Sequence, residues 1–273
     1  MQHPPDCAPV SVVVPCYRCS ATIARAVASV AAQTLRPAEL ILVDDGSADA
    51  TRACLYQVQT HYPPGWIRVL AFDENRGAAS ARNAGWNVAT QPLVAFLDAD
   101  DAWHPQKVAV QVDVLQAHPD VQIVGHGFRR VASPSLPQWP VEEQPTQRLQ
   151  RWHVLAKNPF VTPSVMLRRD LPCRFHAGQR YMEDHLLWMQ AACMGLPIAR
   201  IPIALAAIYK RAFGVSGLSA DLWPMERAEL GNYRLLYRNG CLSWPAWVGL
   251  SGYSLLKFVR RVLLVALHPR WRR

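Results

Sequence analysis

Residues 93–101 read LVAFLDADD, and the rest of the chain is interpreted outward from them. The first five residues of this segment are apolar and have the length and composition of a buried β-strand. Asp98, Asp100 and Asp101 follow the apolar run directly. Because Asp98 and Asp100 are two residues apart in chain that begins extended, their carboxylates can point to the same side and share a ligand. The segment predicts a sheet strand with an acidic site at its carboxyl end.

The chain on either side of this segment alternates strand-like and helix-like patterns. Strand signals are apolar β-branched runs, and helix signals are apolar residues at helical spacing or a proline at the first helical position. Strands are predicted at 10–14, 39–43, 67–71, 93–97, 121–124, 164–167 and 201–209, the last interrupted by Pro202, and helices from 23, from 49, at 78–88, from 105 and at 184–194. The alternation predicts an α/β fold with a doubly wound, mostly parallel sheet flanked by helices. Four prolines between residues 133 and 145 mark a loop or a subdomain boundary.

Composition narrows the class of protein without choosing a function. The 273 residues are 51% hydrophobic, which is enough for a sizeable core and excludes a disordered chain. The net charge of +9 favours anionic partners such as nucleotide phosphates, nucleic acid or an acidic membrane surface. The first residues lack the order of a signal peptide, and the seven cysteines lack the spacing of a secreted scaffold, so we expect a cytoplasmic protein with reduced thiols. The C-x-x-C at residues 16–19 has no second cysteine pair and is not expected to bind metal.

Acidic residues also follow the second predicted strand, as Asp44-Asp45-Gly46-Ser47, and the first predicted strand ends in Pro15-Cys16-Tyr17. In an open α/β sheet, ligands bind beyond the carboxyl ends of the strands, where these segments meet. Clustered carboxylates repel one another unless a cation is bound, and hard oxygen ligands suit Mg²⁺ or Mn²⁺. The alternative for residues 44–47 is a strand-to-helix turn with a capping acid, and capping is the favoured role for Asp49 and Thr51.

Four motifs in order resemble the nucleotide-binding half of family 2 glycosyltransferases, over about the first 125 residues. The motifs are Val12-Val13-Val14-Pro15-Cys16-Tyr17, Val43-Asp44-Asp45-Gly46-Ser47, Asn75-Arg76-Gly77-Ala78-Ala79-Ser80-Ala81-Arg82-Asn83 and Phe96-Leu97-Asp98-Ala99-Asp100-Asp101. The resemblance implies a GT-A fold, which is Rossmann-like, and inverting, non-processive sugar transfer. Arg18 stands where the family commonly has Asn, which leaves the acidic motif untouched.

The resemblance also implies roles for residues of the first half. Pro15, Tyr17 and Asp45 are expected to hold the nucleotide base, and Arg82 is expected to lie near the nucleotide or the diphosphate. Asp98 would contact the ribose or the metal. Asp100 would be the firmer ligand of a Mn²⁺ or Mg²⁺ ion that bridges to the diphosphate.

The second half is expected to supply the base that takes the acceptor proton, because inverting transfer to a hydroxyl needs one. By resemblance Asp184 is this base and Glu183 a neighbour that positions the acceptor or the metal. The alternative is a helix N-terminus stabilised by two acids against the macrodipole. Lys210 and Arg211 resemble the segment that closes over the diphosphate, the alternative being an exposed basic turn. Residues 160–164 are expected to contact the acceptor.

The C-terminal segment, residues 246–267, is predicted to be an amphipathic helix. Lys257, Arg260 and Arg261 share one face at helical spacing, and their place in the middle of the segment excludes a simple spanning helix. Such a helix either lies on an anionic membrane or packs on the domain with a solvated basic stripe. The predicted organisation is a catalytic domain, 1–220, with a donor half at about 8–130 and an acceptor half at about 146–220, followed by a helical extension, 221–273.

The predicted function is inverting transfer of a sugar from a nucleotide sugar, with UDP favoured, to a hydroxyl of a glycan or lipid-linked acceptor. The implied setting is envelope polysaccharide, lipopolysaccharide or glycolipid synthesis at the inner face of the cell membrane. One alternative is a non-catalytic nucleotide-sugar-binding protein of the same fold. A nucleotidyltransferase would present a Gly-rich phosphate loop early in the chain, and no nucleic-acid-binding module is present in the sequence, so neither of these classes is favoured.

Overall fold

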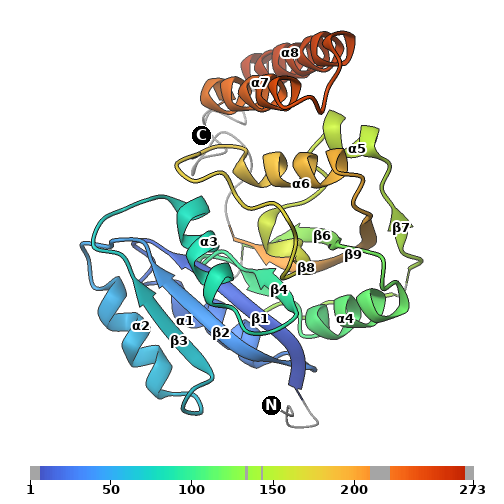
Figure 1. Ribbon diagram of the computed structural model, residues 1–273. Helices are drawn as coiled ribbons and strands as arrows, with labels where there is room; N and C mark the ends of the chain where they lie inside the picture. Colours follow the sequence, from blue (N-terminus) through green and yellow to red (C-terminus); the bar gives the residue numbers. More distant parts are fainter. Residues whose placement is uncertain (1–6, 133–134, 143, 210–221, 268–273) are drawn as a thin grey trace.

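The computed structural model describes residues 7–132, 135–142, 144–209 and 222–267, and they form one mixed sheet with helices on both faces (Figure 1). The strands are β1 (Cys7–Cys16), β2 (Arg36–Asp44), β3 (Ile67–Ala71), β4 (Leu93–Phe96), β5 (Ala102–Trp103), β6 (Ile123–Arg130), β7 (Gln147–Arg148), β8 (Met166–Arg168) and β9 (Ile198–Ile208). The helices are α1 (Ile23–Ala31), α2 (Thr51–Thr60), α3 (Ala78–Val88), α4 (Lys107–Ala117), α5 (Arg151–Ala156), α6 (Glu183–Cys193), α7 (Leu222–Arg238) and α8 (Trp244–Leu267), with a 3₁₀ turn at Thr162–Ser164.

The sheet order is β3-β2-β1-β4-β8-β6-β9-β5, with β7 pairing β9. Strands β3, β2, β1 and β4 are parallel, as the alternating sequence pattern predicts for the first half. The second half is mixed, because β8 pairs antiparallel with β4 and β6 whereas β6 and β9 are parallel. The parallel half therefore brings the ends of β1, β2 and β4 to one edge, where the acidic motifs lie.

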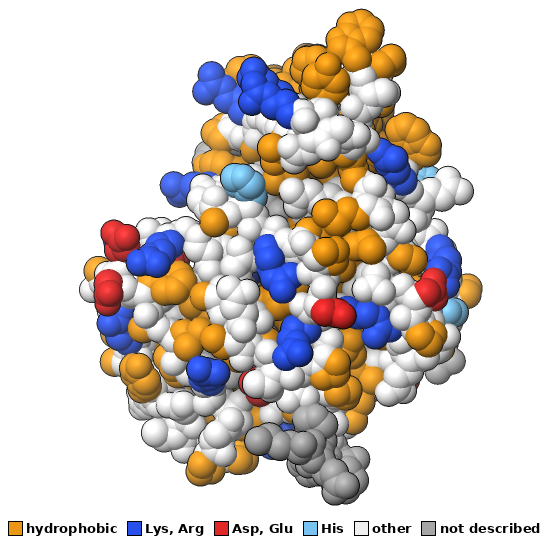
Figure 2. All heavy atoms as spheres, in the orientation of Figure 1, with side chains coloured by type: hydrophobic (Ala, Val, Ile, Leu, Met, Phe, Trp, Pro, Cys, Tyr) orange, Lys and Arg blue, Asp and Glu red, His pale blue; other side chains and the backbone are white. Residues whose placement is uncertain are grey.

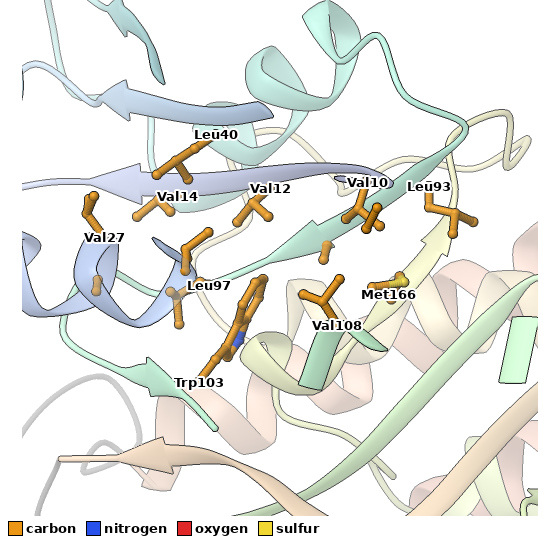
Figure 3. Close-up of a cluster of buried hydrophobic side chains, with 14 of the residues drawn as sticks. Val10, Val12, Val14, Val27, Leu40, Leu93, Leu97, Trp103, Val108 and Met166 are labelled. Atoms are coloured by element: carbon orange, nitrogen blue, oxygen red, sulfur yellow. The ribbon is translucent and has the colours of Figure 1, made fainter. Parts of the chain in front are cut away.

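Alternation along β1 builds the two halves of the core. Val10, Val12 and Val14 point to the face covered by α1, α2 and α4, whereas Val13 points to the face covered by α3, α5 and α6. Figure 3 shows the first of these clusters, in which β1 side chains pack beside Val27, Trp103 and Val108. All three labelled β1 valines are fully buried, which is the burial expected of a central parallel strand.

Helix α3 approaches β1 very closely, and a glycine makes this possible. A Cβ atom at Gly85 would lie 2.4 Å from Cγ1 of Val13. No side chain larger than hydrogen fits at that distance. The close packing fixes the position of α3, which carries Arg82.

Strand β9 passes through Pro202 without the interruption that the sequence predicts. The register between β6 and β9 shifts around His126 and Gly127, so that Ile201 pairs with His126 but Ala204 pairs with Gly127. Pro202 lies in this bulge, where the strand needs no amide hydrogen for the ladder. The strand therefore continues across the proline with a bulge where an interruption was expected. Elements β5, β7 and α5 were not predicted from the sequence, whereas α7 lies within the helical extension predicted for 221–273.

Helices α7 and α8 pack side by side at one end of the molecule, over α5 and α6 (Figure 1). Cys193 at the end of α6 and Cys241 in the α7–α8 connection form a disulfide, with their Cα atoms 5.7 Å apart. The expectation that all thiols are reduced is therefore wrong for this pair, since nothing in their separation of 48 residues indicates that they meet. Among the described residues no helix is both long and apolar enough to cross a membrane.

Candidate active site

The polar segments that follow β1, β2 and β4 lie together at one edge of the sheet, as expected for parallel strands. The amide of Asp45 donates a hydrogen bond of 2.8 Å to the carbonyl of Cys16, which ties the end of β2 to the end of β1. The amide of Leu97 similarly donates to the carbonyl of Val13 at 3.1 Å. Backbone pairing alone therefore brings the first-half motifs to a common site.

Three carboxylates gather after β4. One oxygen each of Asp98, Asp100 and Asp101 lies within 4.8 Å of the others, with Asp98 and Asp100 half-buried and Asp101 buried. The amide of Asp101 donates to the carbonyl of Asp98 at 3.0 Å, which turns the chain back on itself. Oxygen ligands at this spacing fit a Mg²⁺ or Mn²⁺ ion. Sequence analysis did not assign Asp101 to the metal set, although it quoted this residue in the motif.

Arg82 connects this acidic cluster to the second half of the chain. The side chain is 4% exposed, and its guanidinium donates to Asp98 Oδ1 at 2.8 Å and to Glu183 Oε1 at 2.9 Å. Burial alone disfavours a charged guanidinium, but the two carboxylates outweigh it and raise the pKa of Arg82 above its ordinary value. Arg82 is therefore a permanent cation between the predicted metal ligands and the predicted base.

Asp184 is the second residue of α6. The helix begins at Glu183, directly after Met182, which has the left-handed conformation with φ of 56°. Its Oδ1 accepts hydrogen bonds from the His185 amide at 2.6 Å and from Asn158 Nδ2 at 3.3 Å. Its Oδ2 accepts from the Thr162 hydroxyl at 3.3 Å. Burial raises the pKa of Asp184, and the charge of Arg82 with these hydrogen bonds opposes the rise. Three hydrogen bonds thus hold the Asp184 carboxylate in one orientation.

Glu183 is the other acid at the start of α6. Burial raises its pKa, and the neighbouring Asp184 adds to the rise while Arg82 opposes it. Because Glu183 Oε1 accepts a hydrogen bond from Arg82, Glu183 is an ion-pair partner of that guanidinium. Two acids in the first turn also interact favourably with the helix macrodipole, so the capping interpretation is compatible with the same geometry.

The segments assigned to the nucleotide base differ in exposure. Tyr17 is 44% exposed, Pro15 is half-buried, and the Arg18 guanidinium lies 5.2 Å from the Tyr17 ring centroid. Asp45 is 2% exposed, and its carboxylate accepts from the amides of Arg76 and Gly77 at 2.7 and 2.9 Å and from Asn75 Nδ2 at 3.0 Å. Asp45 therefore organises the loop before α3, in addition to any contact with a base.

Gly46 is required by the backbone at this point. Its φ is +65°, and a Cβ atom there would lie 2.3 Å from the carbonyl carbon of Glu74. The loop that Asp45 holds thus packs directly on the turn after β2.

Asp44, Asp49 and Thr51 serve the scaffold. Asp44 is fully buried and accepts from Arg52 Nε at 2.8 Å and from the Ser47 amide at 3.2 Å. Asp49 accepts from the Thr51 amide at 3.0 Å, and the Thr51 hydroxyl accepts from the Cys19 amide at 2.8 Å. The Asp49 bond lies at the start of α2, whose N-cap is Ala50 and has no side-chain cap, whereas the Thr51 bond ties α2 to the segment after β1.

Some of the remaining predicted site residues lie outside the part of the chain that the structure describes. Lys210 and Arg211 fall in 210–221, outside the described residues. Of residues 160–164, Thr162 contacts Asp184 as given above. Asn158 was missed, because a residue 26 positions before its partner leaves no periodic signal in the sequence.

The chain is similar in sequence to known glycosyltransferases. The model of the family "Glycosyl transferase family 2" matches residues 11–172. The UDP-Glc:alpha-D-GlcNAc-diphosphoundecaprenol beta-1,3-glucosyltransferase WfgD of Escherichia coli is 34% identical over 181 residues, which cover 66% of this chain and 68% of that protein. The matches to this chain cover 36%, 85% and 68% of the lengths of three curated relatives, of which WfgD is the third.

Solved structures share the fold at low sequence identity. Staphylococcus aureus TarS residues 1–349 in complex with UDP-GlcNAc has a TM-score of 0.67 at 19% identity, covering 90% of this chain and 71% of that one. The mannosyltransferase PcManGT of Pyrobaculum calidifontis in complex with GDP-Man and Mn²⁺ has a TM-score of 0.66 at 19% identity, covering 99% and 86%. These likenesses confirm the predicted GT-A fold.

Proposed function

The chain belongs to glycosyl transferase family 2, and from this premise we propose that it transfers a sugar from a UDP-sugar to an acceptor hydroxyl with inversion at the anomeric carbon. The observation that carries the proposal is the arrangement around Arg82. One guanidinium contacts both Asp98, in the acidic cluster after β4, and Glu183, beside Asp184 at the start of α6. A site for the leaving diphosphate and a base for the acceptor are thus adjacent.

In the proposed reaction Asp184 accepts the proton of the acceptor hydroxyl. The acceptor oxygen forms a bond to the anomeric carbon while the bond from that carbon to the diphosphate breaks, and the nucleoside diphosphate leaves with the electron pair. The raised pKa of Asp184 suits this role, because a base works best when its pKa is near the working pH. Asn158 and Thr162 hold the carboxylate in place, with donor atoms 3.3 Å from its oxygens.

We assign a divalent cation, Mn²⁺ or Mg²⁺, to Asp98 and Asp100, with Asp101 as a third carboxylate in reach. When bound, such a cation supplies positive charge to offset the charge that develops on the leaving diphosphate. Arg82 holds Asp98 by a 2.8 Å hydrogen bond and so fixes one ligand before the cation arrives. Lys210 and Arg211 are proposed to add positive charge on the same side of the donor.

The proposed donor nucleotide is UDP, with Pro15, Tyr17 and Asp45 beside the base. WfgD, named for UDP-Glc, supports this choice. TarS in complex with UDP-GlcNAc shows that the fold accommodates a UDP-sugar, whereas PcManGT holds GDP-Man, so the fold alone does not select the base. The donor half, about 8–130, and the acceptor half, about 146–220, are proposed to meet at Arg82.

The proposed acceptor is a glycan or a sugar on a lipid diphosphate, in the synthesis of envelope polysaccharide, lipopolysaccharide or glycolipid. WfgD is named for a diphosphoundecaprenol-linked acceptor, and a further relative, 26% identical over 85% of the chain, is named for amylovoran biosynthesis in Erwinia amylovora. With a lipid-linked acceptor the reaction would take place at a membrane, and the proposed location is the cytoplasmic face of the cell membrane.

The test is a transfer assay in which UDP-sugars are offered with a synthetic polyprenyl-diphosphate-linked GlcNAc, and the anomeric configuration of the product is read by NMR. We expect wild type to form an inverted product in the presence of Mn²⁺. Asp184→Asn is expected to keep donor affinity within about twofold and to lose at least ~100-fold in turnover, as for removal of a general base.

Binding of a UDP-sugar with no transfer to any sugar acceptor would favour the non-catalytic alternative. A product that retains the donor configuration would contradict the role of Asp184 as a base. The variant Asp113→Asn, an exposed acid on α4, is the matched control and is expected to behave as wild type.

A further inference from the structure

Two of the three charged side chains of α8, those of Lys257 and Arg261, pair with buried acids of α7. Lys257 Nζ lies 3.0 Å from Glu229 Oε1 and donates to the Ala156 carbonyl at 2.7 Å. The Arg261 guanidinium lies 3.1 Å from Glu226 Oε2. Both acids belong to α7 and are buried, so these pairs form the contact between the two helices. The expectation of a solvated basic stripe is therefore wrong for Lys257 and Arg261, and only Arg260 of the three cations is exposed.

The opposite face of α8 is apolar and exposed. Leu256 is 71% exposed, and Val259 and Leu263 are each 53% exposed. Further exposed apolar residues of α8 are Trp244, Val248, Tyr253, Leu255, Val262 and Leu264. We call this set the outer face of α8. A helix that packs on a core normally has its apolar side chains inward and its polar side chains in water, whereas α8 has exposed apolar side chains on its outer face. This arrangement indicates that a partner covers the outer face.

The exposed charges of the described α7–α8 hairpin are all positive. Arg227, Arg234 and Arg238 of α7 and Arg260 of α8 are exposed, whereas the acids of the described hairpin, Glu226 and Glu229, are buried. Figure 2 shows hydrophobic and cationic side chains gathered at the end of the molecule formed by these helices. A covering partner must therefore be apolar within and anionic at its surface, and two copies of this face would repel each other.

We propose that the outer face of α8 docks on an anionic lipid bilayer, with the helix lying in the interface. The 24 residues of α8 span roughly 36 Å, so the outer face is long. Leucine and valine on one side, tryptophan and tyrosine among them and arginines at the flank are the features of interfacial helices on anionic lipid. The inference goes beyond the proposed function, because it depends only on the hairpin.

The hairpin is attached firmly to the helix that carries the acid pair. Asn232 Nδ2 of α7 donates to the Met182 carbonyl at 3.0 Å, directly before Glu183. The Tyr233 hydroxyl donates to the Leu155 carbonyl at 2.8 Å. Docking of α8 would therefore hold the start of α6 at a fixed height above the lipid surface.

The test is flotation of the full chain with two kinds of vesicle, phosphatidylcholine alone and phosphatidylcholine with an equal amount of phosphatidylglycerol. We expect binding to the anionic vesicles and at least ~10-fold weaker binding to the neutral ones. Leu256→Asn with Leu263→Asn should weaken binding to anionic vesicles by at least ~10-fold, because two side chains lose their apolar burial. Arg234→Gln with Arg260→Gln should weaken it by roughly 10-fold and remove most of its salt dependence.

The matched control is Tyr56→Asn on α2, which removes another exposed apolar side chain and should leave vesicle binding unchanged. Circular dichroism checks that every variant is folded. Absence of wild-type binding to anionic vesicles would overturn the proposal, as would binding that the Leu256 and Leu263 double variant retains in full. Dimerisation in solution that this double variant abolishes would also overturn it, and would assign the face to a second copy. Donor binding by calorimetry is measured in parallel, so that loss of the lipid site and failure of the proposed function are distinguished.

Discussion

At the scale of single residues, Arg82 contacts both parts of the candidate site. It donates to Asp98 after β4 and to Glu183 at the start of α6, 101 residues further along the chain. The Arg82 and Glu183 side chains are 5% and 12% exposed and the Asp98 side chain is 23% exposed, so the buried cation depends on both acids for compensation. The resemblance alone gave Arg82 a role near the diphosphate, and the structure adds contacts to both acids.

The first prediction concerns the loss of this cation. Arg82→Met should destabilise the fold by about 3 kcal/mol, because Asp98 and Glu183 lose their buried countercharge. Arg82→Lys should cost less but still reduce turnover by at least ~10-fold, since an ammonium cannot reach two carboxylates with a planar fork. Urea unfolding and the transfer assay measure the two effects. Equal stability of Arg82→Met and wild type would contradict the buried ion-pair network.

The second prediction concerns pH and Asn158. The hydrogen bond from Asn158 stabilises the charged form of Asp184 and so lowers a pKa that burial has raised. Removing it in Asn158→Ala should raise the pKa of Asp184 further. Because the base acts when deprotonated, the acid limb of the kcat profile should move to higher pH, with donor affinity unchanged. A fall in kcat at every pH without movement of the limb would show that Asn158 does not tune the base.

At the scale of elements, strands and helices of the first half follow local sequence patterns closely. The strand at 67–71 and the helix at 78–88 have the predicted bounds, because apolar periodicity decides both. The break expected at Pro202 is absent because a long-range bulge with β6 accommodates the proline. Helix α7 lies within the predicted helical extension, but the partners of its buried Glu226 and Glu229 lie in α8 and are not visible in a local pattern.

The site shows the same limit of prediction from sequence. Asp98 and Asp100 were singled out because acids follow a strand end, which is a local feature, and Asp184 was singled out by the family resemblance. The pairing of Arg82 with Glu183 and the contact of Asn158 with Asp184 depend on how distant segments pack. The disulfide between Cys193 and Cys241 depends on the same packing of distant segments.

The third prediction concerns the α7–α8 contact. Glu226 is fully buried and accepts from the Ser254 hydroxyl at 2.7 Å as well as pairing with Arg261. Glu226→Ala should lower the free energy of unfolding by about 2 kcal/mol, less than for a fully buried pair because Arg261 is one-third exposed and can be rehydrated. Urea unfolding measures the change.

The matched control for Glu226 is the exposed pair of Asp120 and Arg148, whose side chains are 52% and 54% exposed. Asp120→Ala should cost less than about 0.5 kcal/mol, because water screens the pair. A loss for Glu226→Ala no larger than that for the control would show that the buried charges do not hold the hairpin in place.

At the scale of the whole molecule, one edge of the sheet and one end of the chain have separate tasks. The edge holds the acidic cluster and Arg82, whose guanidinium reaches Glu183 beside Asp184 in the second half of the chain. The α7–α8 hairpin packs its charges inward and presents an apolar, positively flanked face outward. A lipid-docked hairpin beside a site for a lipid-linked acceptor would place the enzyme where its acceptor is.

The central claim is that the acidic cluster binds a nucleotide donor through a divalent cation, and calorimetric titration of UDP with and without Mn²⁺ tests it most directly. We predict binding by wild type and by the control Asp113→Asn that needs Mn²⁺ and is at least ~10-fold weaker in Asp100→Asn. Binding of equal strength without the metal and in Asp100→Asn, or no binding of any nucleoside diphosphate to the folded wild type, would contradict the account.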